Sequence, residues 1–466
     1  MKERFSPEAN IHYRISSADE LTSDLSVLSG FIMHHRKHQR PRLDTLLKYY
    51  EGRNTKVLRE RRRRESHLAD NRATHNFAEY VSGFIQGYLV GVPIKTSYPD
   101  EEIEETIREI NRDNNADEHN SNIVLDQSIF GRAYELLYRS KNDKTRFTIS
   151  DVRETFVIYD DTVEMDPVAG VRYVYNRFTD KTTVFLYTDS EIITYDLDYD
   201  YKLHKKDEAI HAFGDVPIIE YRNNRFRRGD FEKVLNLIDL YDEAQSDTAN
   251  YMTDFNDAML KIVGNLKIDE DQAKKMKEHN LLFLQTEPNP DGAEIKADAD
   301  YIYKKYDVEG TEKYKDRIKN DIHMFTHTPN MDDESFAGTQ SGEALKYKLF
   351  GLEQKRATKE RMFKKSLRKR YELINNMLNV ASEGDFDVDE IEIKFTPNLP
   401  KNVTEEIEAF TKLGGELSDK TKLSILSFVE NPDEELERIE KESPTSRQLE
   451  QMFPFDLDEE TTSENE

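Results

Sequence analysis

Residues Thr328 to Ser382 read TPNMDDESFAGTQSGEALKYKLFGLEQKRATKERMFKKSLRKRYELINNMLNVAS. An acidic loop follows Pro329, and beyond Ser341 apolar residues recur mostly in steps of three, four or seven, at Leu345, Leu349, Leu352, Phe363, Leu367, Tyr371, Ile374 and Leu378. With no proline before Pro397, this spacing predicts a helix of about 40 residues, roughly 60 Å long, with one buried face. Gly351 is the expected kink, since glycine costs about 1 kcal/mol in a helix interior. A mobile loop leading into so long a helix predicts that a large assembly surrounds the chain.

The segment from Asp333 to Leu349 resembles the corresponding segment of tailed-phage portal proteins of the SPP1 type. Upstream stretches resemble the same family at Lys48–Gly52, Asn76–Val81 and Gly87–Ile94, so the resemblance extends over most of the chain. It implies a homo-oligomeric ring, usually of twelve subunits, whose channel passes double-stranded DNA into and out of a virus head. The partners it implies are the terminase, a head-completion adaptor, and the major capsid and scaffolding proteins, with no membrane.

The composition fits extended, surface-rich elements better than one compact globule. Of the 466 residues 36% are hydrophobic and 34% charged, and the length predicts two to four domains. The absence of cysteine excludes disulfides and thiolate metal sites. No run approaches 18 apolar residues and no signal sequence is present, so we expect a soluble protein made in the cytoplasm. The resemblance implies that this is the host cytoplasm and that the protein is carried in the virion, at the portal vertex of the capsid. The net charge of −26 argues against static gripping of DNA, although such a charge also serves solubility alone.

We expect a mainly helical α+β fold, arranged as the resemblance implies into a wing, a stem, a clip and a crown that assemble into a ring. The expected parts are a flexible arm at 1–24, a wing at 25–230 that is first helical and then β-rich, a stem helix at 231–263, a clip at 264–302, a second stem helix at 303–328, a tunnel loop at 329–341, a long kinked wing helix and a strand at 342–399, a crown at 400–445, and an acidic disordered tail at 446–466. Short β-branched and aromatic runs between 134 and 221 predict antiparallel meanders.

The predicted stem helix begins at Asp230 as its N-cap. The face of this helix predicted to be buried, which we call the seam, has steps of three and four throughout. Acidic residues such as Asp239 and Asp242 lie outside it. The seam residues are Phe231, Val234, Ile238, Tyr241, Gln245, Thr248, Met252, Phe255, Met259 and Ile262. A narrow heptad seam favours a ring of similar helices side by side, while one helix in an ordinary bundle is the alternative. The returning helix is expected to bury Tyr314, Ile318, Ile322 and Phe325.

Two sets of residues are candidate functional sites. The resemblance places the loop at the narrowest part of the channel, with the lining residues Asn330, Met331, Asp332, Asp333, Glu334, Ser335, Phe336 and Gln340. These side chains offer weak contacts without fixed positive charge, which suits DNA that must keep moving. The alternative is a connecting loop whose acids cap the next helix. Leu281, Leu282, Phe283 and Leu284 form the expected clip strand that docks the terminase and then the adaptor.

Basic residues gather in two places in this acidic chain. Arg59 and the run Arg61–Arg64 suit a phosphate contact, a solvated stretch or a partner for acidic residues of another subunit. The basic stripe, which we define as Lys346, Lys348, Lys355, Arg356, Lys359, Arg361, Lys364, Lys365, Arg368, Lys369 and Arg370, faces either packaged DNA or neighbouring subunits.

No catalytic constellation is evident, so we expect no enzyme, no cofactor and no metal. The chain lacks a phosphate-binding GxxxxGK[ST] loop, a GxSxG motif and a cysteine nucleophile. The histidine pairs His34/His38 and His323/His327 have helical i,i+4 spacing but are expected on helix surfaces. Two other classes of function stay open. One is a Mg²⁺-dependent nuclease using Asp160, Asp161 and Asp166, which a turn also explains, and the other is a cytoplasmic helical scaffold.

Overall fold

The computed structural model has a mixed α+β fold. It describes residues 4–59, 69–255, 259–264, 281–285, 298–302, 307–331, 347–398, 403–412, 417–423 and 432–442, together with 269, 275, 426 and 429. The chain forms two compact units, the first comprising 1–338 and 347–398 and the second 339–346 and 399–466. The larger unit contains both β-sheets of the expected wing and all the long helices.

Helical segments make up most of the described residues from Leu25 to Phe130, and polar side chains cap several of them. They are α2 (Leu25–His34), the π-helical turn η2 (His35–Gln39), α3 (Arg40–Tyr50), α4 (Phe77–Val90), α5 (Glu101–Asp113) and α6 (Ala116–Phe130). Asn76 caps α4 through the Glu79 N–H, and Asp100 caps α5 through two N–H groups. Gly131 ends α6 at φ +84°, where a Cβ would lie 2.2 Å from the Arg227 carbonyl oxygen. Only glycine fits this close approach.

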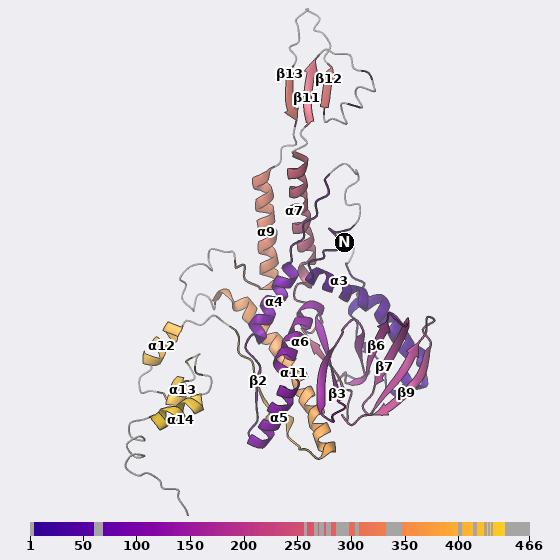
Figure 1. Ribbon diagram of the computed structural model, residues 1–466, viewed down its shortest axis with the longest axis vertical. Coiled ribbons are helices and arrows are strands. Elements are labelled where there is room, and N and C mark those ends of the chain that lie inside the picture. Colours follow the sequence, from indigo (N-terminus) through magenta and orange to yellow (C-terminus); the bar gives the residue numbers. More distant parts are fainter. Residues whose placement is uncertain are drawn as a thin grey trace, which may run out of the picture. The chain divides into compact units, whose positions relative to one another are not determined.

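Two sheets contain the antiparallel strands that the sequence predicted for 134–221 (Figure 1). The larger has the order β1-β5-β6-β7-β8-β9, and the smaller has the order β10-β3-β4. The strands are β1 (Tyr13–Arg14), β3 (Arg132–Arg139), β4 (Thr145–Ser150), β5 (Thr155–Tyr159), β6 (Pro167–Asn176), β7 (Lys181–Tyr187), β8 (Glu191–Leu197), β9 (Leu203–Ile210) and β10 (Ile218–Arg222). A further pair joins β2 (Lys95–Ser97) to β14 (Glu392–Lys394).

The expectation of a loose N-terminal arm is wrong for the residues described there. The segment contains η1 (Pro7–Asn10), β1 and α1 (Asp19–Ser23), and β1 pairs in parallel with β5. Tyr13, Ile15 and Leu21 are buried in the core of the larger sheet. Tyr13 and Ile15 alternate as in a strand, but the run is too short to mark one, and their burial depends on a sheet formed more than a hundred residues later.

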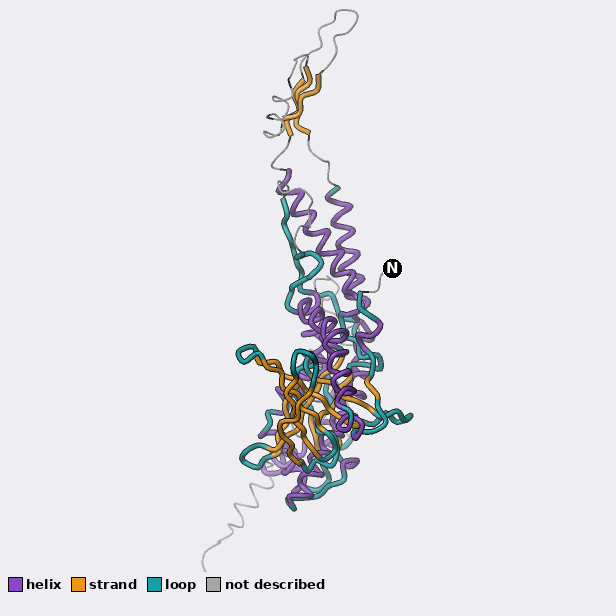
Figure 2. The backbone as a smooth tube through the Cα atoms, turned by 90° about the vertical axis from the view of Figure 1, so that its right-hand side faces the viewer, coloured by secondary structure: helices purple, strands orange, loops and turns teal. Residues whose placement is uncertain are grey.

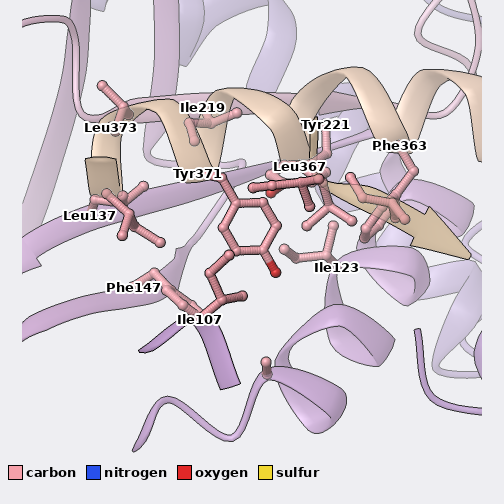
Figure 3. Packing of buried hydrophobic residues seen from close by; sticks show 14 of the residues in the cluster. Ile107, Ile123, Leu137, Phe147, Ile219, Tyr221, Phe363, Leu367, Tyr371 and Leu373 are labelled. Carbon is pink, nitrogen blue, oxygen red and sulfur yellow. The ribbon is translucent and has the colours of Figure 1, made fainter. Parts of the chain in front are cut away.

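Helix α11 (Phe350–Ala381) runs through the core of the larger unit. Its predicted apolar face is confirmed, because Leu352, Phe363, Leu367, Tyr371, Ile374 and Leu378 are all buried. Figure 3 shows this face packed against side chains of α5, α6, β3, β4 and β10. Each such side chain contributes roughly 1.5–3 kcal/mol by leaving water. The helix is interrupted at Leu349, a turn residue between the helical residues Tyr347 and Lys348 and the start of α11, two residues before the predicted kink at Gly351.

Helices α7 (Leu235–Phe255) and α9 (Val308–Thr326) lie side by side, as Figure 2 shows. Between them in sequence is a small sheet with the order β12-β11-β13, made of β11 (Met259–Gly264), β12 (Leu281–Gln285) and β13 (Asp298–Ile302). The predicted helix to 263 is therefore too long. Leu260, Ile262 and Val263 belong to a β-branched and aliphatic run that pairs with two strands instead of continuing the helix.

The predicted faces of these two helices need correction. Asp230 is not a helix cap, because the short 3-10 helix η3 (Glu232–Val234) comes before α7 and Phe231 is its cap residue. Phe231, Val234 and Ile238 are buried as predicted, but Met252 is half exposed. On α9 the predicted Ile318 and Ile322 are buried, whereas Tyr314 and Phe325 are exposed.

One face of α7 buries polar side chains. We call this face the polar stripe and define it as Asp239, Asp242, Ser246 and Asn250. An extended segment, 69–76, runs along this stripe. Its alternate backbone N–H groups donate to helix side chains: Asn71 to Asn250 Oδ1 at 2.6 Å, Ala73 to Ser246 Oγ at 3.0 Å, and His75 to Asp242 Oδ1 at 2.9 Å. Asp239 accepts from Tyr49 and Arg4. Asp239 and Asp242, which the sequence prediction placed outside the seam, therefore bind other segments of the chain to the helix.

The smaller unit contains three described helices near the positions expected for 400–445. They are α12 (Val403–Lys412), α13 (Asp419–Leu423) and α14 (Pro432–Glu442). The tail at 446–466 lies outside the described residues.

Candidate functional site

The predicted tunnel loop is described only at its two flanks. Asn330 and Met331 lie on the first flank, and Met331 is 59% exposed. Asp332, Asp333, Glu334, Ser335, Phe336 and Gln340 lie outside the described residues. The geometry of the site is therefore the geometry of the loop base, which we define as residues 326–331 and 347–355.

The first flank is fixed by a tight turn at the end of α9. His327 has φ +59°, and the Thr328 N–H donates to the His323 carbonyl at 3.2 Å. The Thr326 and Thr328 hydroxyls are 2.7 Å apart, and the Tyr80 hydroxyl donates to the Pro329 carbonyl at 2.7 Å. The loop consequently leaves from a backbone attached to helix α4.

His323 is not on the helix surface, contrary to the sequence expectation. Its side chain is buried, and its ring lies edge-on to Tyr80 with centroids 5.4 Å apart. His327, by contrast, is exposed as expected, and its ring approaches the point where a Cβ of Gly351 would lie. The i,i+4 spacing of these histidines therefore serves the turn and does not form a shared ligand pair.

The second flank is tied to the first by Lys355. Its ammonium donates to the Thr326 carbonyl at 3.1 Å and pairs with Asp230 at 2.8 Å. One turn further along α11, Lys359 pairs with the other oxygen of Asp230 at 2.7 Å and also contacts Asn223. Two lysines of α11 thus share the buried carboxylate of Asp230, two residues before η3, and one of them, Lys355, also holds the end of α9.

The electrostatics of this junction favour the ionised form of Asp230. Burial alone would raise the pKa of Asp230, but the two ammonium groups outweigh it and hold that pKa well below its usual range. Burial also lowers the pKa of Lys359, against the opposing attraction of Asp230. Removing one partner would leave an uncompensated buried charge, which is strongly destabilising.

Large apolar side chains are exposed on both sides of the loop base. Five of them are more than half exposed: Met324 at 64%, Phe325 at 51%, Met331 at 59%, Tyr347 at 75% and Phe350 at 62%. Neighbouring exposed apolar side chains are typical of surfaces at which proteins contact other molecules.

A second buried ion pair holds the far half of α11. Arg370 and Glu135 are both fully buried and 2.6 Å apart, and His119 lies 2.6 Å from the same carboxylate. Burial would raise the pKa of Glu135, but Arg370 and His119 bring it down to about 2. Sequence reasoning missed this pair, because the partners are 235 residues apart and nothing in the local pattern marks them.

Most of the described basic stripe is paired within its own chain. Lys355, Arg356, Lys359, Lys364, Lys369 and Arg370 all form ion pairs with carboxylates of the same unit. Arg361, Lys365 and Arg368 are exposed, and no ion pair is recorded for them among the described residues. They recur at i, i+4 and i+7, so three cations share one outward helix face.

The predicted clip strand is present as β12, which pairs in parallel with β11. Leu282 is 37% exposed and Leu284 is 44% exposed, whereas Leu281 and Phe283 are less accessible. The alternation leaves two leucines on one outward face of this strand.

The nuclease alternative gains no support from the described residues. The Asp160 carboxylate accepts from the Thr162 and Asp166 N–H groups and from the Thr162 hydroxyl, so it stabilises a turn. Across the described ranges, no group of three or more His, Asp or Glu side chains is arranged to hold a metal ion. His34 instead contacts Glu8 and the Tyr13 hydroxyl. None of the described helices is both long and apolar enough to cross a lipid bilayer.

Comparisons with known proteins agree over most of the chain. Residues 29–448 match the family model described as "Phage portal protein, SPP1 Gp6-like". The chain is 26% identical over 396 residues to the portal protein of Bacillus phage SPP1, covering 80% of this chain and 76% of that one. It is 24% identical over 389 residues to the portal protein of Clostridium phage phiCD119, covering 78% of this chain and 83% of the relative.

Solved structures of gene transfer agent particles also match, at lower similarity. A chain from the neck of an empty particle matches with a TM-score of 0.42 and 13% identity over 75% of this chain and 89% of that one. A chain from the native virion matches with a TM-score of 0.43 and 11% identity over 82% of this chain and 92% of that one.

Proposed function

The chain belongs to the SPP1-type family of phage portal proteins, and from this premise we propose that copies of it form a closed ring whose bore carries double-stranded DNA into and out of the head. As a portal protein it is a structural component of the virion and not an enzyme. Beyond family membership, we propose that the ring has twelve subunits and that the loop lies at the narrowest point of the bore. We also propose that the subunit is divided into a wing, a stem, a clip and a crown.

The observation that carries the proposal is the construction of the loop base. Lys355 and Asp230 fix the two flanks to the stem and the wing, while Met331, Tyr347 and Phe350 stay exposed. A fixed loop base with exposed apolar side chains suits a subunit whose neighbours in an assembly cover those side chains. A ring supplies such neighbours through one repeated contact.

The charge of the loop suits passage better than gripping. Asp332, Asp333 and Glu334 repel phosphates, and twelve copies would form an acidic collar. Counterions soften this repulsion, because screening at physiological salt acts over about 8 Å. Met331, Phe336 and Gln340 offer soft apolar or hydrogen-bonding contacts. Many weak contacts guide DNA without stalling it.

We further propose that the small sheet is the clip. Its β12 strand, with Leu282 and Leu284 outward, would dock first the terminase and later the head-completion adaptor. The major capsid and scaffolding proteins would contact the ring during head assembly. Replacing Leu282 and Leu284 by serine should abolish docking to both partners in rings that still form.

The test of the ring is native mass measurement of the purified chain, followed by negative-stain imaging. We expect a single large species with an open axial hole wide enough for B-form DNA. Particles that remain monomers or dimers at micromolar concentration, even with the scaffolding protein added, would contradict the ring. DNA cleavage by the purified chain in the presence of Mg²⁺ would revive the nuclease alternative.

A further inference from the structure

A cationic hollow of about 350 Å³ lies between the N-terminal segment, α3 and the start of α7; we call it the N-terminal cleft. An adjoining hollow, also of about 350 Å³, shares part of the same N-terminal wall and adds Lys37 and His38. The charged residues that line the N-terminal cleft are Arg4, Arg42, Arg228, Glu232 and Lys233. Four cations against one carboxylate is an unusual excess in a chain with a net charge of −26.

Glu232, whose carboxylate is the single one among the residues lining the cleft, already pairs with a cation of the cleft wall. Glu232 accepts from Arg42 through two bonds of 2.8 and 2.6 Å and from the Gly229 N–H at 3.0 Å. Arg4 pairs with Asp239 at 2.6 Å. Arg228 and Lys233 are exposed, and within the described ranges no ion pair is recorded for either of them. The cleft therefore keeps two positive charges that its own walls do not balance.

Arg42 forms part of the wall of the cleft and is held by the chain itself. Its side chain is 2% exposed, and its Nη2 donates to the carbonyls of Phe130 and Arg227 as well as to Glu232. The positive charges that remain for a ligand are therefore those of Arg228 and Lys233.

We propose that the N-terminal cleft binds carboxylates of an acidic segment on a neighbouring copy of this chain. Arg228 and Lys233, the two exposed cations of the cleft, are the groups that such a segment would meet. A ring contact joins two different surfaces of the same chain, and 93 acidic residues make a complementary surface abundant. The inference rests on the proposed ring and names one of its contacts.

Zero-length cross-linking with a carbodiimide tests this contact directly. Rings are assembled from a mixture of nitrogen-15-labelled and unlabelled chains, so that cross-links between copies carry mixed isotope patterns. We expect Lys233 to be joined to an Asp or Glu of another copy. Lys233→Gln, which removes the reactive amine without reversing charge, must remove that cross-linked peptide and no other.

A charge reversal then tests whether the contact supports assembly. Arg228→Glu combined with Lys233→Glu should raise the concentration at which half the chains are assembled by about tenfold or more. The control is Lys205→Glu with Lys206→Glu on the exposed strand β9, which makes the same change in charge and should leave that concentration unchanged. Circular dichroism confirms that each variant is folded.

The outcomes separate this inference from the ring itself. Rings in which Lys233 forms no cross-link between copies would overturn the cleft proposal and leave the ring proposal standing. Equal effects of the two charge reversals would overturn it as well. A third outcome is that a labelled DNA duplex binds the wild type and the Lys205→Glu, Lys206→Glu control but not the Arg228→Glu, Lys233→Glu variant, with no cross-link between copies. A phosphate is then the occupant, and the proposal is wrong. Failure of the wild-type chain to assemble contradicts the ring.

Discussion

Helices α11 and α7 are both long, but the surrounding protein holds them in opposite ways. α11 buries an apolar face and two charged junctions, Asp230 with Lys355 and Lys359, and Glu135 with Arg370. α7 buries a polar stripe that accepts hydrogen bonds from an extended segment, and the ion pair of this stripe with Arg4 has a partly exposed arginine. Buried ion pairs with apolar packing are expensive to break, whereas single hydrogen bonds contribute about 0.5–1.5 kcal/mol each. The comparison indicates that α11 is held rigidly in the core, and that separating α7 from the segment 69–76 costs less free energy than displacing α11.

The most severe way to test this difference is Arg370→Ala. It leaves the buried Glu135 carboxylate without its cation, with only His119 and the Tyr221 hydroxyl as hydrogen-bond partners among the described residues, so the free energy of unfolding should fall by about 3–5 kcal/mol. Chemical denaturation followed by circular dichroism measures the change. Arg368→Ala, on the exposed face of the same helix, should change it by less than about 0.5 kcal/mol. Similar losses in the two variants would mean that the buried pair does not hold α11.

The same ion pair predicts how stability depends on pH. The pKa of Glu135 in the folded chain is about 2, below its ordinary 4.5, so the folded state favours the ionised form. Its contribution is fully present above about pH 4.5 and is lost as the pH falls towards 2. Unfolding curves between these limits should show a steep loss of stability in the wild type. Glu135→Gln should be less stable at neutral pH but show a shallower slope, and an unchanged slope would contradict the assignment.

A smaller effect is expected on α7. Asp242→Ala removes the acceptor for Asn54 and for two groups of His75, which should cost about 1–3 kcal/mol. Hydrogen exchange should show faster exchange along 69–76 with little change in α11. Asp316→Ala, on the exposed face of α9, is the control. If α11 is released together with 69–76, the two helices are not held independently.

The smallest effect on folding is expected in the loop itself. Changing Asp332, Asp333 and Glu334 together to lysine should alter the free energy of unfolding by less than about 0.5 kcal/mol and leave assembly intact. The same change should slow or arrest DNA packaging, because cations would grip passing phosphates. Packaged DNA length per head, with rings of confirmed stoichiometry, measures the result. Wild-type length and rate would show that the charge of this loop does not govern passage.

Local periodicity made some of these features predictable from the sequence. The face of α11 from Leu352 to Leu378 repeats at helical spacing, and the strands between 134 and 221 are short and β-branched, so both were predicted correctly. A local pattern shows what a segment buries when its own residues determine the periodicity.

Distant partners made other features unpredictable. Asp242 looks like a surface acid, yet Asn54 and His75 cover it from 188 and 167 residues away. One signal was present: Asp239, Asp242, Ser246 and Asn250 follow steps of three and four, which places four small polar residues on one helix face. The arm at 1–24 gave no such signal, because Tyr13 and Ile15 are buried only after β5 exists to receive them.

The pairing of Arg4 with Asp239 has a consequence for the order of synthesis. The two residues are 235 positions apart, so the segment with Arg4 cannot be held at α7 until Asp239 has been synthesised. At roughly 5–20 residues per second the delay is about 10–50 s, long enough for the sheets to begin forming before the segment is held at α7. A bulky group attached beside Arg4 would therefore interfere with this later step while leaving the earlier folding of the sheets unaffected.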